Sequence, residues 1–484
     1  MNRLEKAMES VKGAVSLAEK DPYKPDYHAA APAFWINDPN GLIQVNGAYH
    51  LFYQHNPYEA KWGNIHWGHM KSTDLVHWEH LPIALAPDEQ YDRDGCFSGS
   101  AVEHEGKIWL FYTGNRWLAD DEDEEAVQTQ NIAVSEDGVH FRKLPINPIL
   151  EVPAEHGVSS HFRDPKVWPH EGKWYMVLGA TREGNGKVLL YSSVNLLDWS
   201  FESVLTDSSD WEAYMLECPD FFTLGDKEVL LVSPQGVGPA DQPDISGCFI
   251  GNLDYATGEY RHGDFAKIDE GLNFYAPQTF EDESGRRILI GWMRMENIAE
   301  ADGWAGCMTV PRELVLDEDG RLLVKPVSEL ETLRQEHVSY KNVALAAGEK
   351  RTLAGISGDV GELKATFDLK NCTASSFGLA LRVSDDGVER VTLSFDVASR
   401  TITFDRDAAG GGPKGKRSWT VDADRDTLTL HVFLDKSAIE VFTNDGERAM
   451  SSLVFANPAN RAIQWEAEGG DVRVSAIDYW TLET

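Results

Sequence analysis

Three carboxylates stand at the start of apolar, strand-like segments, where they could act as general acids, bases or nucleophiles. Asp38 lies in segment 35–41, Asp164 follows Arg163 and precedes a proline, and Glu217 opens segment 217–220. A carboxylate at the entry of a buried strand can be held rigidly, because proline fixes φ and glycine permits a turn. Taken alone, Asp-Pro-Asn-Gly favours an ordinary turn over a catalytic position.

Repetition of the motif separates these interpretations. Segments 97–102 and 275–280 occupy the remaining two intervals, the second without an acid. Each of the five copies is followed by a polar turn and a second apolar segment, at 48–53, 107–112, 173–178, 228–232 and 287–290. A Ser-x-Asp/Asn turn that ends in an aromatic residue recurs at 72–78, 135–141 and 193–199. A unit of three or four short strands cannot bury its faces alone, so five copies predict a five-bladed β-propeller.

The propeller predicts that the three acids lie together. The first strand of each blade lines the central channel, so Asp38, Asp164 and Glu217 should converge near the axis. Gathered carboxylates repel one another, which favours a catalytic cluster over a structural or metal-binding one. Gln54 ends a second strand and Trp62 lies in the loop that follows it. An amide and a ring face suit a ligand rich in hydroxyl groups.

Other residues could also do chemistry, but simpler roles are favoured. Cys218 could be a nucleophile, yet no histidine shares its motif, and we expect a small buried side chain. His66, His69, His77 and His80 could bind zinc. They are interleaved with tryptophans and lack a nearby set of Cys or Asp ligands, so packing within a blade is favoured. We therefore predict neither a metal nor a cofactor.

Composition limits the classes of partner. The 484 residues carry a net charge of −35, which argues against nucleic acid or an anionic membrane as partner. No stretch is long enough to span a bilayer, and residues 3 to about 20 are helix-like but too polar for a signal peptide. Five scattered cysteines predict a reduced, cytoplasmic chain. The acidic run 120–125 predicts a solvated loop, with calcium binding as the alternative.

The length predicts more than one domain, and the overall prediction is an all-β chain with a short N-terminal helix. Alternating strands such as 363–369, 377–383, 391–397 and 428–434 predict an antiparallel β-sandwich that supports the propeller or binds a ligand. Ser328 and Glu331 predict a capping box in a short helix before it. The predicted domains are a helical extension at 1–24, the propeller at 25–325, a helical linker at 326–344 and the sandwich at 345–484.

At these motifs the sequence resembles glycoside hydrolase family thirty-two, which contains invertases, sucrose-6-phosphate hydrolases and fructanases. The matching segments are 35–41, 97–100, 163–165, 217–220, 275–278, 291–293 and, in the predicted sandwich, 438–446. The resemblance implies that Asp38 is the nucleophile, Glu217 the acid/base and Asp164 the transition-state stabiliser. It also implies fructosyl-binding positions at Asn37, Gln54, Trp62, Phe97, Ser98, Arg163 and Trp292.

The implied activity is retaining hydrolysis of the β-fructofuranosyl bond in sucrose or sucrose 6-phosphate. Asp38 would form a covalent fructosyl-enzyme while Glu217 protonates the leaving oxygen, and water would then complete the reaction. Asp164 would hold sugar hydroxyls, with Arg163 keeping its carboxylate ionised.

Two alternatives stay open at this point. A fructosyltransferase or a fructo-oligosaccharide hydrolase would use the same site. A non-catalytic sugar-binding module is the alternative from another class, and the presence of all three acids argues against it. The expected partner is a small sugar, and a homodimer is left open.

Overall fold

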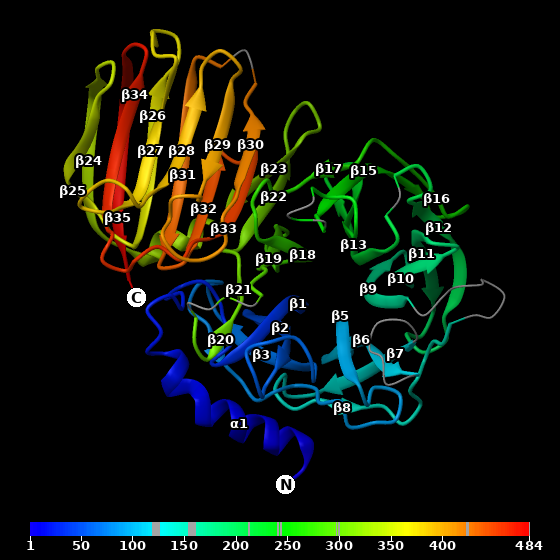
Figure 1. Cartoon of the computed structure of the whole chain (residues 1–484). Helices are drawn as coiled ribbons and strands as arrows, with labels where there is room; N and C mark the ends of the chain where they lie inside the picture. The colour runs from blue at the N-terminus through cyan, green and yellow to red at the C-terminus, as the bar shows by residue number, and fades with distance from the viewer. Residues whose placement is uncertain are drawn as a thin grey trace.

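The structure is a computed structural model that describes residues 1–118, 126–152, 161–211, 213–239, 242, 244–296, 298, 301–422 and 425–483. The predicted acidic loop 120–125 lies outside the described residues. The described chain is mostly β, as the sequence predicts, and its strands form seven sheets (Figure 1). No described helix is long and apolar enough to cross a membrane.

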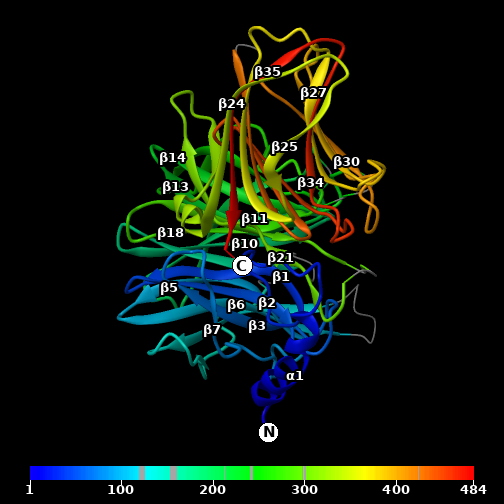
Figure 2. The ribbon, with the colours of Figure 1, turned by 90° about the vertical axis from the view of Figure 1, so that its left-hand side faces the viewer.

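The predicted N-terminal helix is present as α1, Arg3–Ala18. Its N-cap is Asn2, whose side chain accepts from the Glu5 backbone while the Glu5 carboxylate accepts from the Asn2 backbone, which forms a capping box. Ala7 and Ala18 are buried, whereas most of the other side chains are exposed. The helix therefore packs on the first sheet through a narrow apolar face (Figure 2).

Five small sheets follow in chain order. The first contains β1 (Phe34–Val45), β2 (Ala48–Asn56), β3 (His66–Ser72), β4 (Glu79–His80) and β20 (Trp304–Ala305). The second contains β5 (Gly95–His104), β6 (Lys107–Trp117), β7 (Ala126–Ser135) and β8 (Arg142–Lys143). The third contains β9 (Phe162–His170), β10 (Lys173–Arg182), β11 (Asn185–Ser193) and β12 (Ser200–Asp207). Within each sheet, strands that follow one another in sequence pair antiparallel.

The fourth sheet contains β13 (Leu216–Leu224), β14 (Lys227–Pro234), β15 (Gly247–Asp254), β16 (Glu259–His262) and β17 (Ala266–Lys267). The fifth contains β18 (Phe274–Glu281), β19 (Arg287–Met293), β21 (Cys307–Met308), β22 (Arg312–Leu316) and β23 (Leu322–Pro326). The first strands of the five sheets meet around a common centre: β1 contacts β5 and β18, β9 contacts β5 and β13, and β13 contacts β18 (Figure 1). The short strand β20 pairs in parallel with β1, far from it in sequence.

The recurring Ser-x-Asp/Asn element is a turn near the outer edge of three sheets. Asp74 Oδ1 accepts hydrogen bonds from the backbone N–H groups of Val76 and His77, at 3.0 and 2.9 Å. Asp137 and Asn195 accept equivalent bonds in the second and third sheets. The side chain thus replaces backbone partners in a tight turn, which explains the recurrence of this residue type.

Two six-stranded antiparallel sheets form the second half of the chain. One has the order β24 (Arg334–Leu345), β35 (Val472–Leu482), β26 (Val360–Asp368), β31 (Thr427–Asp435), β32 (Ala438–Thr443) and β33 (Arg448–Leu453). The other has the order β25 (Lys350–Ser357), β34 (Ala462–Glu468), β27 (Ser376–Val383), β28 (Val391–Asp396), β29 (Thr401–Asp405) and β30 (Lys416–Thr420). Side chains from both sheets share one buried apolar cluster.

The predicted helical linker at 326–344 is wrong over most of its length. Only Ser328–Leu333 is helical, as the 3-10 helix η2, and its N-cap is Val327 without a side-chain hydrogen bond, so the predicted capping box is absent. Residues 334–345 form β24 instead. Val338 and Tyr340 lie two residues apart and pack on the apolar cluster between the two six-stranded sheets. This spacing of two favours a strand over a helix.

Buried charges connect the two halves of the chain. Arg312 donates to Asp269, at 2.8 Å, and to Glu440. His28 lies between Asp435 and Glu440, with its ring nitrogens 2.8 and 3.0 Å from the two carboxylates. All five side chains are fully buried at this interface. Because each charge faces an opposite charge, the network can be buried without isolated ions.

Candidate active site

A β-bulge in each of the five first strands shapes the centre of the ring. At this point the first strand has one residue more than its partner strand, and the extra residues fall within 37–38, 98, 164–165, 218–219 and 276–277. Asp164 and Cys218 have positive φ angles, 68° and 48°. A bulge redirects the side chains beside it, so it turns these residues toward the centre. The bulges were not predicted from the sequence, although a proline within or directly after the extra residues marks four of the five first strands, at positions 39, 165, 219 and 277.

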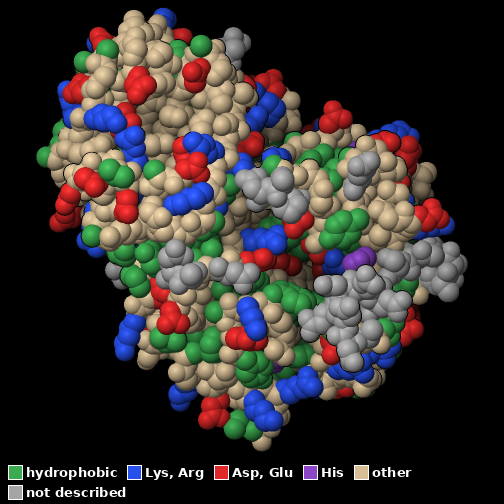
Figure 3. Space-filling model, viewed as in Figure 1, with side chains coloured by type: hydrophobic (Ala, Val, Ile, Leu, Met, Phe, Trp, Pro, Cys, Tyr) green, Lys and Arg blue, Asp and Glu red, His purple; other side chains and the backbone are tan. Residues whose placement is uncertain are grey.

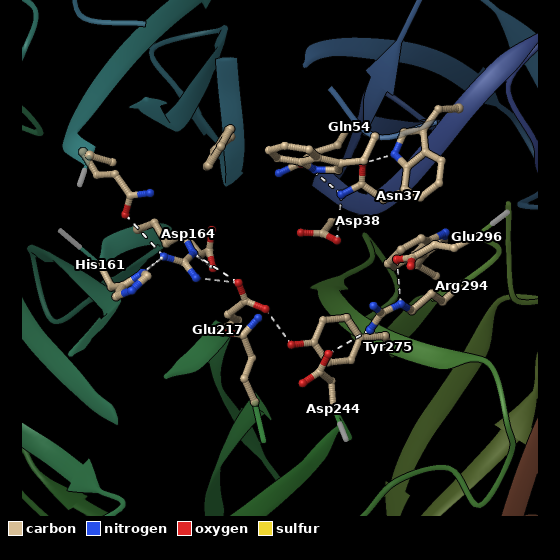
Figure 4. A pocket seen from close by; sticks show the side chains of 18 of the residues that line it. Asn37, Asp38, Gln54, His161, Asp164, Glu217, Asp244, Tyr275, Arg294 and Glu296 are labelled. Carbon is tan, nitrogen blue, oxygen red and sulfur yellow. Dashed lines mark hydrogen bonds and ion pairs between the residues drawn. The ribbon is translucent and has the colours of Figure 1, made fainter. Parts of the chain in front are cut away.

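A pocket of about 400 Å³ opens at this centre (Figure 3). Nine of the ten predicted site residues line it: Asn37, Asp38, Gln54, Trp62, Phe97, Arg163, Asp164, Glu217 and Trp292. The tenth, Ser98, is buried directly behind the carboxylate of Asp38. The carboxylates of Asp38, Asp164 and Glu217 point into one space (Figure 4). The structure thus brings together residues from all five sheets.

Asp38 is held by three neighbouring donors. Its Oδ1 accepts from Asn37 Nδ2 at 3.1 Å, and its Oδ2 accepts from Ser98 Oγ at 2.5 Å and from Cys218 Sγ at 3.4 Å. Burial raises the pKa of Asp38, the Ser98 hydrogen bond opposes this, and the charge of Glu217 adds to it. The donors fix the orientation of the carboxylate and favour its ionised form.

Gln54 orders the residues behind Asp38. Its Oε1 accepts from Asn37 Nδ2 at 2.7 Å, and its Nε2 donates to Ser98 Oγ at 2.5 Å. Trp35 Nε1 donates to Asn37 Oδ1 at 2.7 Å, which fixes the orientation of that amide. Both polar ends of Gln54 are therefore engaged with the residues that hold Asp38, in addition to its place on the pocket wall.

Glu217 is bonded on both oxygens. Its Oε1 accepts from Arg163 Nη2 at 2.6 Å and from Nε at 3.2 Å, and its Oε2 accepts from Tyr275 OH at 2.5 Å. Arg163 Nη1 also lies 2.8 Å from His161 Nδ1, which helps to fix the guanidinium. Tyr275 was not among the predicted site residues, although it occupies the same motif position in the fifth sheet as Glu217 does in the fourth.

Asp164 has a different environment from the one expected. We expected Arg163 to keep it ionised, but Arg163 donates to Glu217, and its Nε is 3.9 Å from Asp164. Burial raises the pKa of Asp164 to about 7; Arg163 opposes the rise, and the charges of Glu217 and Asp38 add to it. Asp164 Oδ2 accepts from the Cys218 backbone N–H at 2.9 Å. Desolvation and two like charges therefore outweigh one cation at this distance.

Aromatic rings and one ion-pair group form the rim. Trp62 is 41% exposed and meets Phe97 edge-on at 6.1 Å between ring centroids. Arg294 pairs with Asp244 at 2.8 Å and with Glu296 at 2.9 Å, and the three residues line the pocket (Figure 4). They were missed because they lie outside the repeated motif. Rings beside hydrogen-bonding groups suit the two kinds of surface that a sugar presents.

The histidines and Cys218 are placed by packing. His69 is buried and stacks on Phe52, with 4.0 Å between ring centroids, and His77 bonds to Asp74 at 2.7 Å. Cys218 is buried as predicted, and burial raises the pKa of its thiol, which disfavours a thiolate nucleophile. Within the ranges that the structure describes, no group of three or more His, Cys, Asp or Glu side chains could hold a metal ion.

Known proteins match the chain over nearly its whole length. Residues 28–326 match the N-terminal domain of the glycosyl hydrolases family 32, and residues 329–481 match the C-terminal domain. The chain is 41% identical over 469 residues to a sucrose-6-phosphate hydrolase of Escherichia coli, which covers 95% of each protein. It is 40% identical over 467 residues to a raffinose invertase of the same organism, again with 95% of each protein covered.

Solved structures also match nearly the whole length of the chain. A GH32 β-fructofuranosidase of Bombyx mori has a TM-score of 0.85 and is 33% identical, covering 100% of this chain and 99% of that one. A sucrose-6-phosphate hydrolase of Lactobacillus gasseri has a TM-score of 0.87 and is 29% identical, covering 98% of this chain and 96% of that one.

Proposed function

The chain belongs to glycosyl hydrolase family 32, and from that premise we propose that it hydrolyses the β-fructofuranosyl bond of sucrose or of sucrose 6-phosphate. The observation that carries the proposal is the convergence of Asp38, Asp164 and Glu217 in one pocket with an aromatic rim. A sugar-binding module without catalysis would have no need for three carboxylates that raise one another's cost of ionisation. The relatives named as sucrose-6-phosphate hydrolases support the same substrates.

We infer that the five small sheets are the blades of a five-bladed β-propeller and that the two six-stranded sheets are a β-sandwich. The contacts between neighbouring first strands support this, as does the pairing of β20 with β1, which joins the end of the ring to its beginning. On this inference the propeller spans about residues 25–325, and the strand β24 supports a sandwich that starts at 334 instead of 345. The five free cysteines support a cytoplasmic location.

The first step breaks the bond between the anomeric carbon C2 and the glycosidic oxygen. An oxygen of ionised Asp38 forms a bond to C2 as that bond breaks, and Glu217 transfers a proton to the departing oxygen. Asn37 and Ser98 hold the attacking carboxylate in one orientation. Tyr275 and Arg163 position the carboxyl of Glu217.

In the second step water attacks C2. Glu217, now ionised, removes a proton from the water, the oxygen bonds to C2, and Asp38 leaves as a carboxylate, so the configuration is retained. Asp164 hydrogen-bonds sugar hydroxyls in both steps. With a pKa of about 7, it is partly protonated near neutral pH and can both donate to and accept from hydroxyl groups.

The test is turnover of sucrose, sucrose 6-phosphate and a fructan oligomer side by side, with release of both products measured. Hydrolysis predicts equal amounts of fructose and of the leaving sugar from either sucrose substrate. Failure to cleave both sucrose and sucrose 6-phosphate would refute the proposed function. Fructose release that lags well behind release of the leaving sugar would indicate transfer to another sugar instead.

A further inference from the structure

A second pocket, of about 560 Å³, lies beside the active site. It is bounded by the first turn of α1 and by the segments around Lys61 and Arg93, and we call it the basic pocket. Trp62 and Trp117 line both pockets. A ligand that extends from the carboxylates past these two rings therefore enters the basic pocket.

The charge of the basic pocket is opposite to that of the whole chain. Its wall carries the four cations Arg3, Lys6, Lys61 and Arg93 and the two acids Glu59 and Asp94. The chain as a whole has a net charge of −35. A local excess of cations on such a protein attracts anions only at short range, because salt screens the more distant charges.

His66, which also lines the basic pocket, adds no charge. Burial lowers the pKa of His66 to about 4, and its Nδ1 is 2.5 Å from the carbonyl oxygen of Asn64. The imidazole is therefore neutral at pH 7, and any anion is met by the two arginines and two lysines alone. Lys61 is paired with Glu59 at 3.1 Å, but both side chains are largely exposed. Exposed pairs of this kind are weak and rearrange readily.

The two arginines are held in place by the protein. Arg3 Nη1 donates to the carbonyl oxygen of Pro87. Arg93 Nη2 donates to the carbonyl oxygen of Trp117 at 3.1 Å, and its Nε donates to Asp94 at 3.1 Å. Each bonded guanidinium keeps further N–H groups for a ligand, because it carries five. Two guanidinium groups are thus fixed beside the pocket before any ligand binds.

Helix stability does not explain Arg3 and Lys6. Both lie in the first turn of α1, where the helix dipole disfavours positive charge, and Glu5 is the acid of that turn. Among the residues that the structure describes, no hydrogen bond or ion pair involves the ammonium of Lys6. Two cations at an unfavourable helix position that face a pocket, one of them without a protein partner for its ammonium, point to an external anion.

We propose that the basic pocket binds the phosphate group of a substrate whose leaving sugar is phosphorylated. This inference rests on the proposed function, because the fructosyl half of the substrate must occupy the pocket of the three carboxylates. The leaving sugar then passes Trp62 and Trp117, and its phosphate, with a charge of about −1.5 to −2, meets the four cations. The chain would thereby prefer sucrose 6-phosphate to sucrose.

The test compares kcat/KM for sucrose 6-phosphate and sucrose in a Lys6→Gln/Lys61→Gln double variant. The ratio of the two values should fall by about tenfold relative to the unaltered protein, and added salt should lower the ratio of the unaltered protein. A Lys12→Gln/Lys20→Gln double variant is the matched control, because it removes the same charge at exposed positions outside the pocket. Its ratio should stay unchanged.

A second measurement uses inhibition of sucrose hydrolysis by glucose 6-phosphate, with glucose as the uncharged comparison. The inhibition constant for glucose 6-phosphate should rise about tenfold in the Lys6→Gln/Lys61→Gln variant, and that for glucose should not. Equal substrate ratios in both double variants would overturn the proposed phosphate site. Cleavage of sucrose by the unaltered protein would still support the proposed function in that case. Absence of cleavage of either substrate would instead refute the function itself.

Discussion

His28 should make the stability of the protein depend on pH between about 6.5 and 9. Burial alone would lower the pKa of His28, but hydrogen bonds to Asp435 and Glu440 raise it from 6.5 to about 9. A histidine with a raised folded-state pKa stabilises the fold fully below its unfolded pKa. That stabilisation is lost as the pH rises through the folded-state value.

The size of the effect follows from the shift. Each pKa unit corresponds to about 1.4 kcal/mol, so the contribution of His28 is at most about 3 kcal/mol at pH 6.5. At pH 8 it falls to about 1.4 kcal/mol, and at pH 10 it is close to zero. The other buried histidines with lowered pKa values act in the opposite direction near pH 6.5, because only the unfolded chain protonates them, but this contribution cancels when the unaltered protein is compared with a His28 variant.

The assay is urea unfolding of the unaltered protein and a His28→Gln variant at pH 6.5, 8 and 10. The difference in unfolding free energy should be largest at pH 6.5 and nearly vanish at pH 10. His77→Gln is the control, since His77 also bonds an aspartate but is exposed. A difference for His28→Gln that stays constant across the three pH values would show that its charge does not hold the two halves together.

Four further outcomes concern catalysis. Asp38→Asn and Glu217→Gln should each lower kcat by roughly three or more decades with unchanged unfolding curves, and full activity in either would remove its catalytic role. Early NMR spectra of the reaction should show β-fructose first, whereas α-fructose would indicate inversion. Tyr275→Phe should lower kcat/KM by about 10- to 100-fold through loss of its hydrogen bond to Glu217, which steady-state kinetics would measure. The pH profile of kcat/KM should contain an ionisation near 7 that Asp164→Asn removes, and its persistence would assign it elsewhere.

The repeated strand motif was enough to predict which acids meet. Equivalent first strands converge, so a register shared by Asp38 and Asp164 becomes a shared location. The partners of each acid could not be read in the same way. Arg163 is adjacent to Asp164 in sequence, yet the bulge directs its guanidinium toward Glu217 on the next sheet. Contacts between sheets depend on side-chain direction, which spacing along the chain does not encode.

The segment that follows the five small sheets shows a second limit. Residues 334–337 are polar and follow a short helix, a pattern that is consistent with helical continuation. The alternation of apolar and polar residues that marks β24 begins only at Val338. The strand also depends on its pairing with β35, which lies more than a hundred residues later in the sequence. Strand pairing of this kind is set by the partner rather than by local preference.

The pairing of β20 with β1 makes completion of the first sheet depend on synthesis of the chain through residue 305. Trp304 pairs with Phe34 and Ala305 with Trp35, next to the residues that hold Asp38. A ribosome adds the roughly 270 residues between these strands in about 15–55 s, during which the edge of β1 at Phe34 has no partner. A truncated chain that ends before residue 304 would carry all three carboxylates yet leave Phe34 and Trp35, at the start of β1, without their pairing to β20. Such fragments would be exposed to aggregation and degradation and would not act as partial enzymes.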